Sequence, residues 1–71
     1  MVWVFKTTVE KENQVAGLAP VLDSLVQDHG DWNFDLEDCD HILRVNAPHV
    51  AADEIIELIE LEGFFCEELE D

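Results

Sequence analysis

The chain has 71 residues and is strongly acidic, with 18 Asp and Glu against 3 Lys and Arg, and a formal net charge of −15. This length suits one small domain, so residues 1–71 are expected to form a single unit with a modest core. Nucleic acids and anionic membranes are not expected as partners, because both are bound through clustered basic side chains. No stretch matches a signal peptide or a membrane span, so we expect a cytoplasmic protein with reduced cysteines.

The first half of the chain predicts a strand and then a helix. Residues 2–9 are rich in β-branched and aromatic side chains, which indicates a strand. From about Asn13 to His29, apolar residues recur at steps of three and four, which predicts a helix. Its apolar stripe consists of Val15, Leu18, Leu22, Leu25 and Val26. Asn13 is the expected N-cap, Pro20 predicts a bend, and Gly30 is the expected stop.

The second half predicts a hairpin, a second helix and a last strand. The expected ranges are 32–37 and 41–47 for the hairpin strands, 51–62 for the helix and 64–66 for the last strand. Alternation of apolar and polar residues indicates the first of these strands, and residues 38–40 supply the turn. Ala52, Ile55, Ile56 and Ile59 form the buried stripe of the helix, which Gly63 closes.

This order of elements predicts an α+β fold. Right-handed crossovers place both helices on one face of a four-stranded antiparallel sheet with the order 4-1-3-2, which is the ferredoxin-like βαββαβ plait. The first loop, the hairpin turn and the last helix-to-strand loop then lie at one end. Cys39 and Cys66 fall near opposite edges, roughly 14 Å apart, so we expect neither a disulfide nor a shared metal. Cys66 is expected to be a small buried residue.

Four segments also carry a family resemblance, and their order and spacing are compatible with it. They are residues 5–22, 32–37, 42–45 and 52–64. Together they resemble the heavy-metal-associated (copper-chaperone-like) domain, which binds Cu(I) or a similar soft ion between the thiolates of a Cys-x-x-Cys pair. Here the two cysteine positions hold Lys11 and Gln14, and an ammonium and an amide do not replace thiolates. We therefore expect no metal or cofactor in this loop.

The resulting hypothesis is a small non-catalytic interaction module that has lost its metal site. The resemblance implies that partners dock at the metal-loop end, which would present Glu10, Glu12, Asp38, Asp40 and Phe64. Residues from 50 onward include nine acidic side chains and no basic one, so we expect this negative face to attract a basic protein partner. The domain itself is expected to be a monomer. No enzyme is expected, because the sequence has no nucleophile–base motif and no glycine-rich phosphate loop.

Three alternatives remain open from the sequence. Copper or zinc could bind through non-standard ligands, with Cys39 and His41 of the Asp38–His41 segment as candidates, although strand side chains alternate in direction. The segment Asp23-Ser24-Leu25 resembles the modification site of acyl carrier proteins, with phosphopantetheine on Ser24, but its mid-helix position and the predicted strands argue against that family. A passive domain from a salty habitat would also be acidic.

Overall fold

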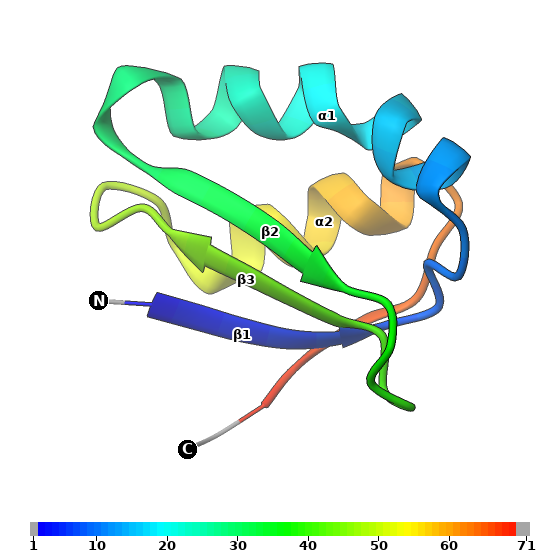
Figure 1. Cartoon of the computed structure of the whole chain (residues 1–71). Coiled ribbons are helices and arrows are strands. Elements are labelled where there is room, and N and C mark those ends of the chain that lie inside the picture. The colour runs from blue at the N-terminus through cyan, green and yellow to red at the C-terminus, as the bar shows by residue number, and fades with distance from the viewer. Residues whose placement is uncertain (1, 70–71) are drawn as a thin grey trace.

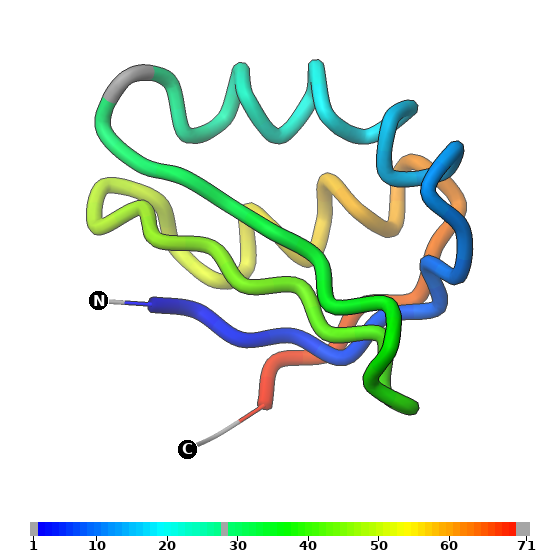
Figure 2. The backbone as a smooth tube through the Cα atoms, viewed as in Figure 1, coloured from blue at the N-terminus to red at the C-terminus, as the bar shows by residue number. Residues whose placement is uncertain are grey.

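The computed structural model describes residues 2–69, except for the side chain of Asp28 (Figures 1 and 2). It contains a four-stranded antiparallel sheet and two helices, which confirms the α+β class expected from the sequence. The strands are β1 (Val2–Thr7), β2 (Asp31–Asp35), β3 (Ile42–Asn46) and β4 (Cys66–Glu68). The helices are α1 (Glu12–Val26) and α2 (Ala52–Leu61), and a short 3₁₀ turn, η1 (Gln27–His29), follows α1.

The strands lie in the order β2-β3-β1-β4, which is β4-β1-β3-β2 when it is counted from the other edge. The central strands β1 and β3 are antiparallel and place Phe5 opposite Leu43. Both helices lie on the same side of the sheet (Figure 1). Within residues 2–69 no helix covers the opposite side, which we call the open face.

One apolar core fills the layer between the sheet and the helices. Members that are at most 2% exposed include Phe5, Leu43 and Val45 from the sheet, Leu18, Leu22 and Val26 from α1, and Ile55 and Ile59 from α2. Alternate strand residues, and helix residues three or four apart, face the same way. The stripes expected from periodicity are therefore the ones that meet in the core. Among residues 2–69, neither α1 nor α2 combines the length and the apolar run needed to cross a bilayer.

The ends of α1 differ from the prediction. Its N-cap is Lys11, which has extended backbone geometry, so the predicted cap at Asn13 is wrong. The reason is Gln14, whose Oε1 accepts hydrogen bonds from the backbone N–H groups of Glu10 (2.8 Å) and Lys11 (3.0 Å) and so fixes an earlier start. The α-helix continues through Pro20 to Val26, short of the predicted end near His29. The 3₁₀ turn η1 then carries the helical backbone to its C-cap, Gly30, which is the predicted stop.

The last strand begins two residues later than predicted, because the end of α2 uses the preceding residues. Gly63 has a positive φ of 95° and donates its N–H to the carbonyl of Glu60. Phe64 donates its N–H to the carbonyl of Ile59, which completes a Schellman motif. Gly63 therefore closes the helix as expected, and β4 runs from Cys66 to Glu68 instead of 64–66.

Candidate functional site

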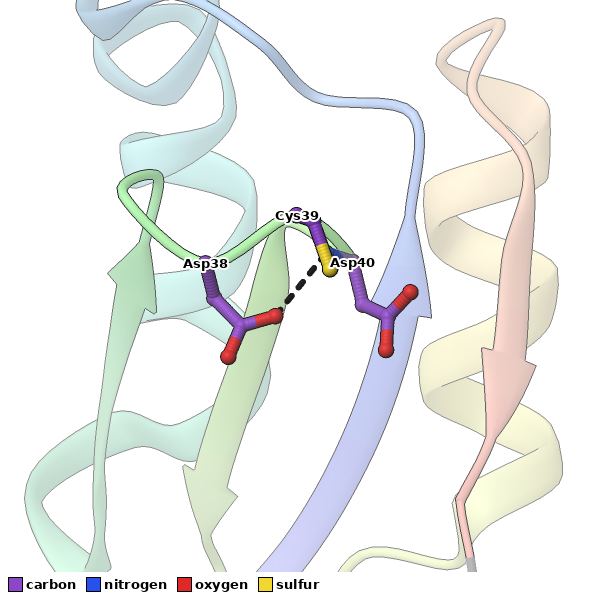
Figure 3. Close-up of side chains that lie close together, drawn as sticks. All are labelled: Asp38, Cys39 and Asp40. Atoms are coloured by element: carbon purple, nitrogen blue, oxygen red, sulfur yellow. Dashed lines mark hydrogen bonds between the residues drawn. The ribbon is translucent and has the colours of Figure 1, made fainter.

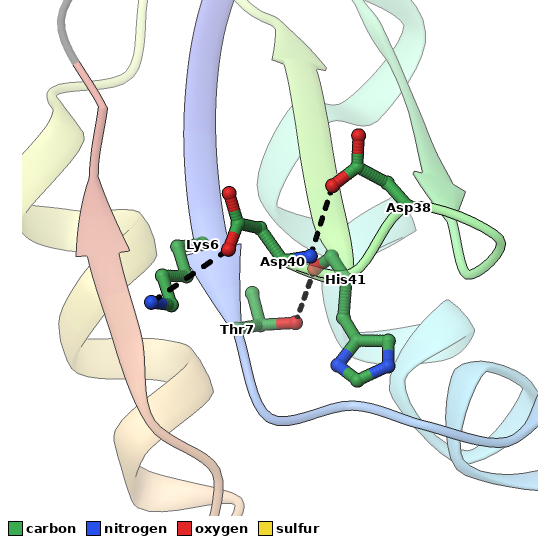
Figure 4. Close-up of polar contacts among 5 residues, drawn as sticks. All are labelled: Lys6, Thr7, Asp38, Asp40 and His41. Atoms are coloured by element: carbon green, nitrogen blue, oxygen red, sulfur yellow. Dashed lines mark hydrogen bonds and ion pairs between the residues drawn. The ribbon is translucent and has the colours of Figure 1, made fainter.

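Three loops meet at one end of the sheet, and we call residues 8–12, 36–41 and 62–65 together the loop end. Backbone and hydroxyl groups of Thr7 and Thr8 join them. The Thr7 hydroxyl donates to the carbonyl of His41 at 2.7 Å (Figure 4). The Thr7 N–H donates to the carbonyl of Asp40 at 3.2 Å. Thr8 exchanges hydrogen bonds with the backbone of Phe65. The expected meeting of these loops is confirmed, and the links give the surface a fixed frame.

Most of the predicted docking residues lie on this surface. Glu10, Glu12 and Asp38 are exposed, and Asp40 is half-buried. Phe64 is half-buried and packs against the core, so it offers little area to a partner. The sequence interpretation missed Phe65, whose side chain is 49% exposed. Alternation could have identified it, since a buried Cys66 places the preceding side chain on the outside.

Lys11 and Gln14 stand at the start of α1. Lys11 is exposed, whereas Gln14 is half-buried and its side-chain oxygen already accepts two backbone hydrogen bonds. The amide therefore holds the loop against the helix. An exposed ammonium beside it repels a cation, so these two positions are chemically unsuited to a soft metal.

The hairpin turn brings together the ligand atoms of Asp38, Cys39 and Asp40, which lie within 4.8 Å of one another (Figure 3). Asp38 Oδ1 accepts the N–H of Asp40 at 2.9 Å, and this bond shapes the turn. His41 is not a member of the cluster, because its ring points away from the Asp38 carboxylate (Figure 4). The structure thus groups the Cys39 thiol with the carboxylates of Asp38 and Asp40, and His41 is not part of this group.

The carboxylate of Asp40 also has a basic neighbour. Lys6 Nζ lies 3.7 Å from Asp40 Oδ1 (Figure 4), and Arg44 makes a similar pair with Asp35 at 4.0 Å. Both pairs are about half exposed, so each contributes little stability. Lys6 and Arg44 alternate with core residues of β1 and β3, which places both cations on the open face.

The acidic residues after position 50 lie on α2, on the loop after it and on β4. Glu70 and Asp71 lie outside the described residues. The others are all exposed: Asp53, Glu54, Glu57, Glu60, Glu62, Glu67 and Glu68. In the described part of the chain, α2 therefore carries four exposed carboxylates, whereas Glu67 of β4 stands opposite Lys6 on the open face.

The two cysteines occupy different environments. Both thiols are free, with Cys39 exposed in the turn and Cys66 only 4% exposed in β4. Burial raises the pKa of the Cys66 thiol to about 12, and the nearby charge of Glu60 acts in the same direction. The thiolate is the nucleophile, so Cys66 has the chemistry of an inert core residue.

We expect iodoacetamide to alkylate Cys39 quickly and Cys66 only after unfolding. At neutral pH the reactivity ratio in the native protein should exceed about 100, because Cys66 is both shielded and protonated. Peptide mass spectrometry with and without urea measures this ratio. Equal labelling of both thiols in native protein would contradict the burial.

The same thiol makes the free energy of unfolding depend on pH. Since the folded pKa of Cys66 lies above its unfolded value of 9.0, its contribution to the free energy of unfolding should be retained below pH 9 and lost as the pH rises toward 12.

Ser24 lies within α1 and is exposed. It borders a shallow groove of about 460 Å³ between the helices, lined also by Pro20, Val21, Leu25 and Leu58. Acyl carrier proteins are helical bundles that present the modified serine at a helix start. The described fold instead contains a sheet and places Ser24 well inside a helix, so that resemblance gains no structural support.

The loop end therefore has six carboxylates, one ammonium and one half-exposed phenyl ring on a hydrogen-bonded frame. The carboxylates are Glu10, Glu12, Glu37, Asp38, Asp40 and Glu62, and the ammonium is Lys11. Such a surface can attract cations and basic groups over several ångströms. No family model, curated protein or solved structure matches this chain.

Proposed function

We propose that this chain is a heavy-metal-associated-like domain without the thiolate pair, and that it acts as a non-catalytic interaction module for a basic protein partner. The strand order, counted as β4-β1-β3-β2, and the two helices on one face support a ferredoxin-like plait. Lys11 at the N-cap of α1 and Gln14 in its first turn support a lost metal site. The exposed thiol of Cys39 suits a reducing compartment such as the cytoplasm, and the charge of −15 favours a monomer.

The observation that carries this proposal is the composition of the loop end. Phe65 is 49% exposed in one of the three loops, and each of the three loops carries exposed carboxylates. In protein interfaces, an aromatic anchor with a polar rim supplies much of the binding energy, while complementary charge raises the association rate. The hydrogen bonds of Thr7 and Thr8 hold the loops before a partner arrives, which reduces the entropy cost of binding.

Capture from the native source with two alanine variants tests the proposal. Phe65→Ala should weaken binding of the captured partner about tenfold or more, as expected for a hot-spot residue. Val2→Ala is the matched control, because Val2 is 50% exposed and lies at the far end of β1, and it should bind like the unaltered protein. The association rate should also fall several-fold as salt rises from about 0.05 to 0.5 M. The proposal would be wrong if a captured partner bound Phe65→Ala as tightly as the unaltered protein and its association rate did not depend on salt.

The turn cluster supports a second candidate function, which is metal binding at Asp38, Cys39 and Asp40. One thiolate and two carboxylates suit Zn(II) better than Cu(I), which prefers softer ligands. In a titration of reduced protein with each ion, this function requires amide NMR shifts at residues 38–40 that Cys39→Ser abolishes. Shifts centred on residues 11–14 would instead indicate delivery through the family's own loop.

A further inference from the structure

A groove of about 570 Å³ follows the edge of β2 next to the start of α1. Its lining includes Phe34 and Val15 on the core side, and Asn33, Asp35 and Arg44 on the open face. Successive residues of a strand point to opposite faces of a sheet. A groove that contacts both sets must therefore pass along the backbone edge of the strand itself.

The edge of β2 is available for pairing. Within residues 2–69, β2 has β3 as its one neighbour in the sheet, with Phe34 opposite Leu43 in the antiparallel register. The outward backbone groups of an edge strand can pair with an added strand, and this is a common way in which domains bind extended peptides. The other edge, β4, has only three residues, so β2 offers the longer template.

The chemistry of the groove indicates its occupant. Glu12, Asp35 and Glu37 contribute three negative charges against that of Arg44, while Val15, Phe34 and Leu36 give an apolar floor. Lysine and arginine place aliphatic stems on apolar surface while their charged groups reach carboxylates. A second copy of the chain would instead bring acidic β2 residues, Asp31 and Asp35, against their equivalents, and like charges across a strand pair are destabilising.

We propose that this groove binds an extended segment of the basic partner as a fifth strand, in which basic and apolar residues alternate. Apolar side chains of the segment pack between Val15 and Phe34. Basic side chains on its other face lie beside Asn33 and Asp35. This inference rests on the proposed function, which supplies the basic partner. It adds the site at which the partner binds and the alternating sequence that fits this site.

Two synthetic peptides of equal composition provide the probe, one alternating Lys and Val and the other with three Lys followed by three Val. The alternating peptide should bind about tenfold more tightly, because cross-strand pairs need the right face as well as the right charge. Its amide NMR shifts should centre on residues 31–37, and β2 amides should gain protection from hydrogen exchange. Equal binding of the two peptides, or no binding, would overturn the groove.

Matched charge reversals separate the groove from net charge. Glu37→Lys and Glu57→Lys change the charge equally at exposed positions, but only Glu37 lines the groove. Glu37→Lys should weaken the alternating peptide about tenfold and Glu57→Lys no more than about twofold. If both variants lost the same amount of peptide affinity, overall charge would explain the binding and the proposed groove site would be wrong.

Two further outcomes identify other occupants. Shifts centred on Glu10, Asp38 and Phe65 would overturn the groove and leave the proposed function intact. Concentration-dependent β2 shifts in peptide-free protein, with a dimer in sedimentation, would assign the edge to a second copy. Conversely, peptide binding at β2 combined with a partner that ignores Phe65→Ala would retain the groove and reject the loop end as the docking surface.

Discussion

Replacing Phe5 with alanine is expected to remove about 3–5 kcal/mol from the free energy of unfolding. Phe5 is fully buried in the central strand β1 and faces Leu43 of β3 in the register of the sheet. Its ring is one of the largest fully buried side chains of the core, between the sheet and both helices. Alanine would leave a cavity that a close-packed core cannot fully fill.

The loss is large relative to the total. At about 0.05–0.15 kcal/mol per residue, a domain of 71 residues has roughly 4–11 kcal/mol of stability. The Phe5→Ala variant should therefore be marginal or unfolded in water. Leu61→Ala is the control, because Leu61 is a large apolar residue that is 78% exposed in α2, and its loss should stay within about 0.5 kcal/mol.

Urea unfolding followed by tryptophan fluorescence measures both variants, since the chain has two tryptophans in the strands. If Phe5→Ala lost no more stability than Leu61→Ala, the assignment of Phe5 to the centre of the core would be wrong. A changed slope with denaturant would signal a change in the compactness of the unfolded or native state, or a loss of two-state unfolding.

The core could be predicted from the sequence because its signal is periodic. Leu18, Leu22 and Val26 recur at steps of four, and Ile55 and Ile59 repeat the same step, so the buried stripes follow from helix geometry alone. The strand residues Phe5 and Leu43 follow from alternation and antiparallel pairing in the same way. Burial of apolar surface dominates the folding free energy at these positions, and buried residues recur at the regular spacing of a helix or a strand.

Element ends depend instead on single hydrogen bonds, which have no period. The capping preference of Asn13 suggested the start of α1, but the side chain of Gln14 reaches back to the N–H groups of Glu10 and Lys11 and moves that start to Glu12. Intrinsic capping preferences are worth about 1 kcal/mol, so another local contact can override them. The same limit explains the shifted start of β4.

The candidate site was predictable in position but not in detail. The topology of the sheet indicates that the three loops share an end, and they do. Side-chain directions within the turn were not predictable, because His41 has a positive φ of 49° and its ring points away from the Asp38 carboxylate. Such a backbone conformation is uncommon for residues other than glycine, although histidine is enriched in it. No residue pattern in the turn indicates it.

Gly30→Ala is expected to destabilise the domain, whereas Gly17→Ala should stabilise it. A Cβ on Gly30 would clash with the backbone oxygen of Asn46 and lie 3.2 Å from the Cα of Ala47. Gly30 directly precedes β2, whose first residue pairs with Asn46, so relief requires a shift of the strand pair itself. Overpacking of this kind costs about 1–3 kcal/mol.

Gly17 gives the matched control within the same chain. It lies in α1, and a Cβ there meets nothing within 4 Å, so alanine should add about 0.5–1 kcal/mol through its better helix propensity. Urea midpoints of the two variants should therefore move in opposite directions. A Gly30→Ala protein as stable as the unaltered chain would show that the start of β2 can move away from β3. The sequence suggested that Gly30 ends a helix, but its extended backbone (φ −168°) needs no glycine, and the close approach of Asn46 does.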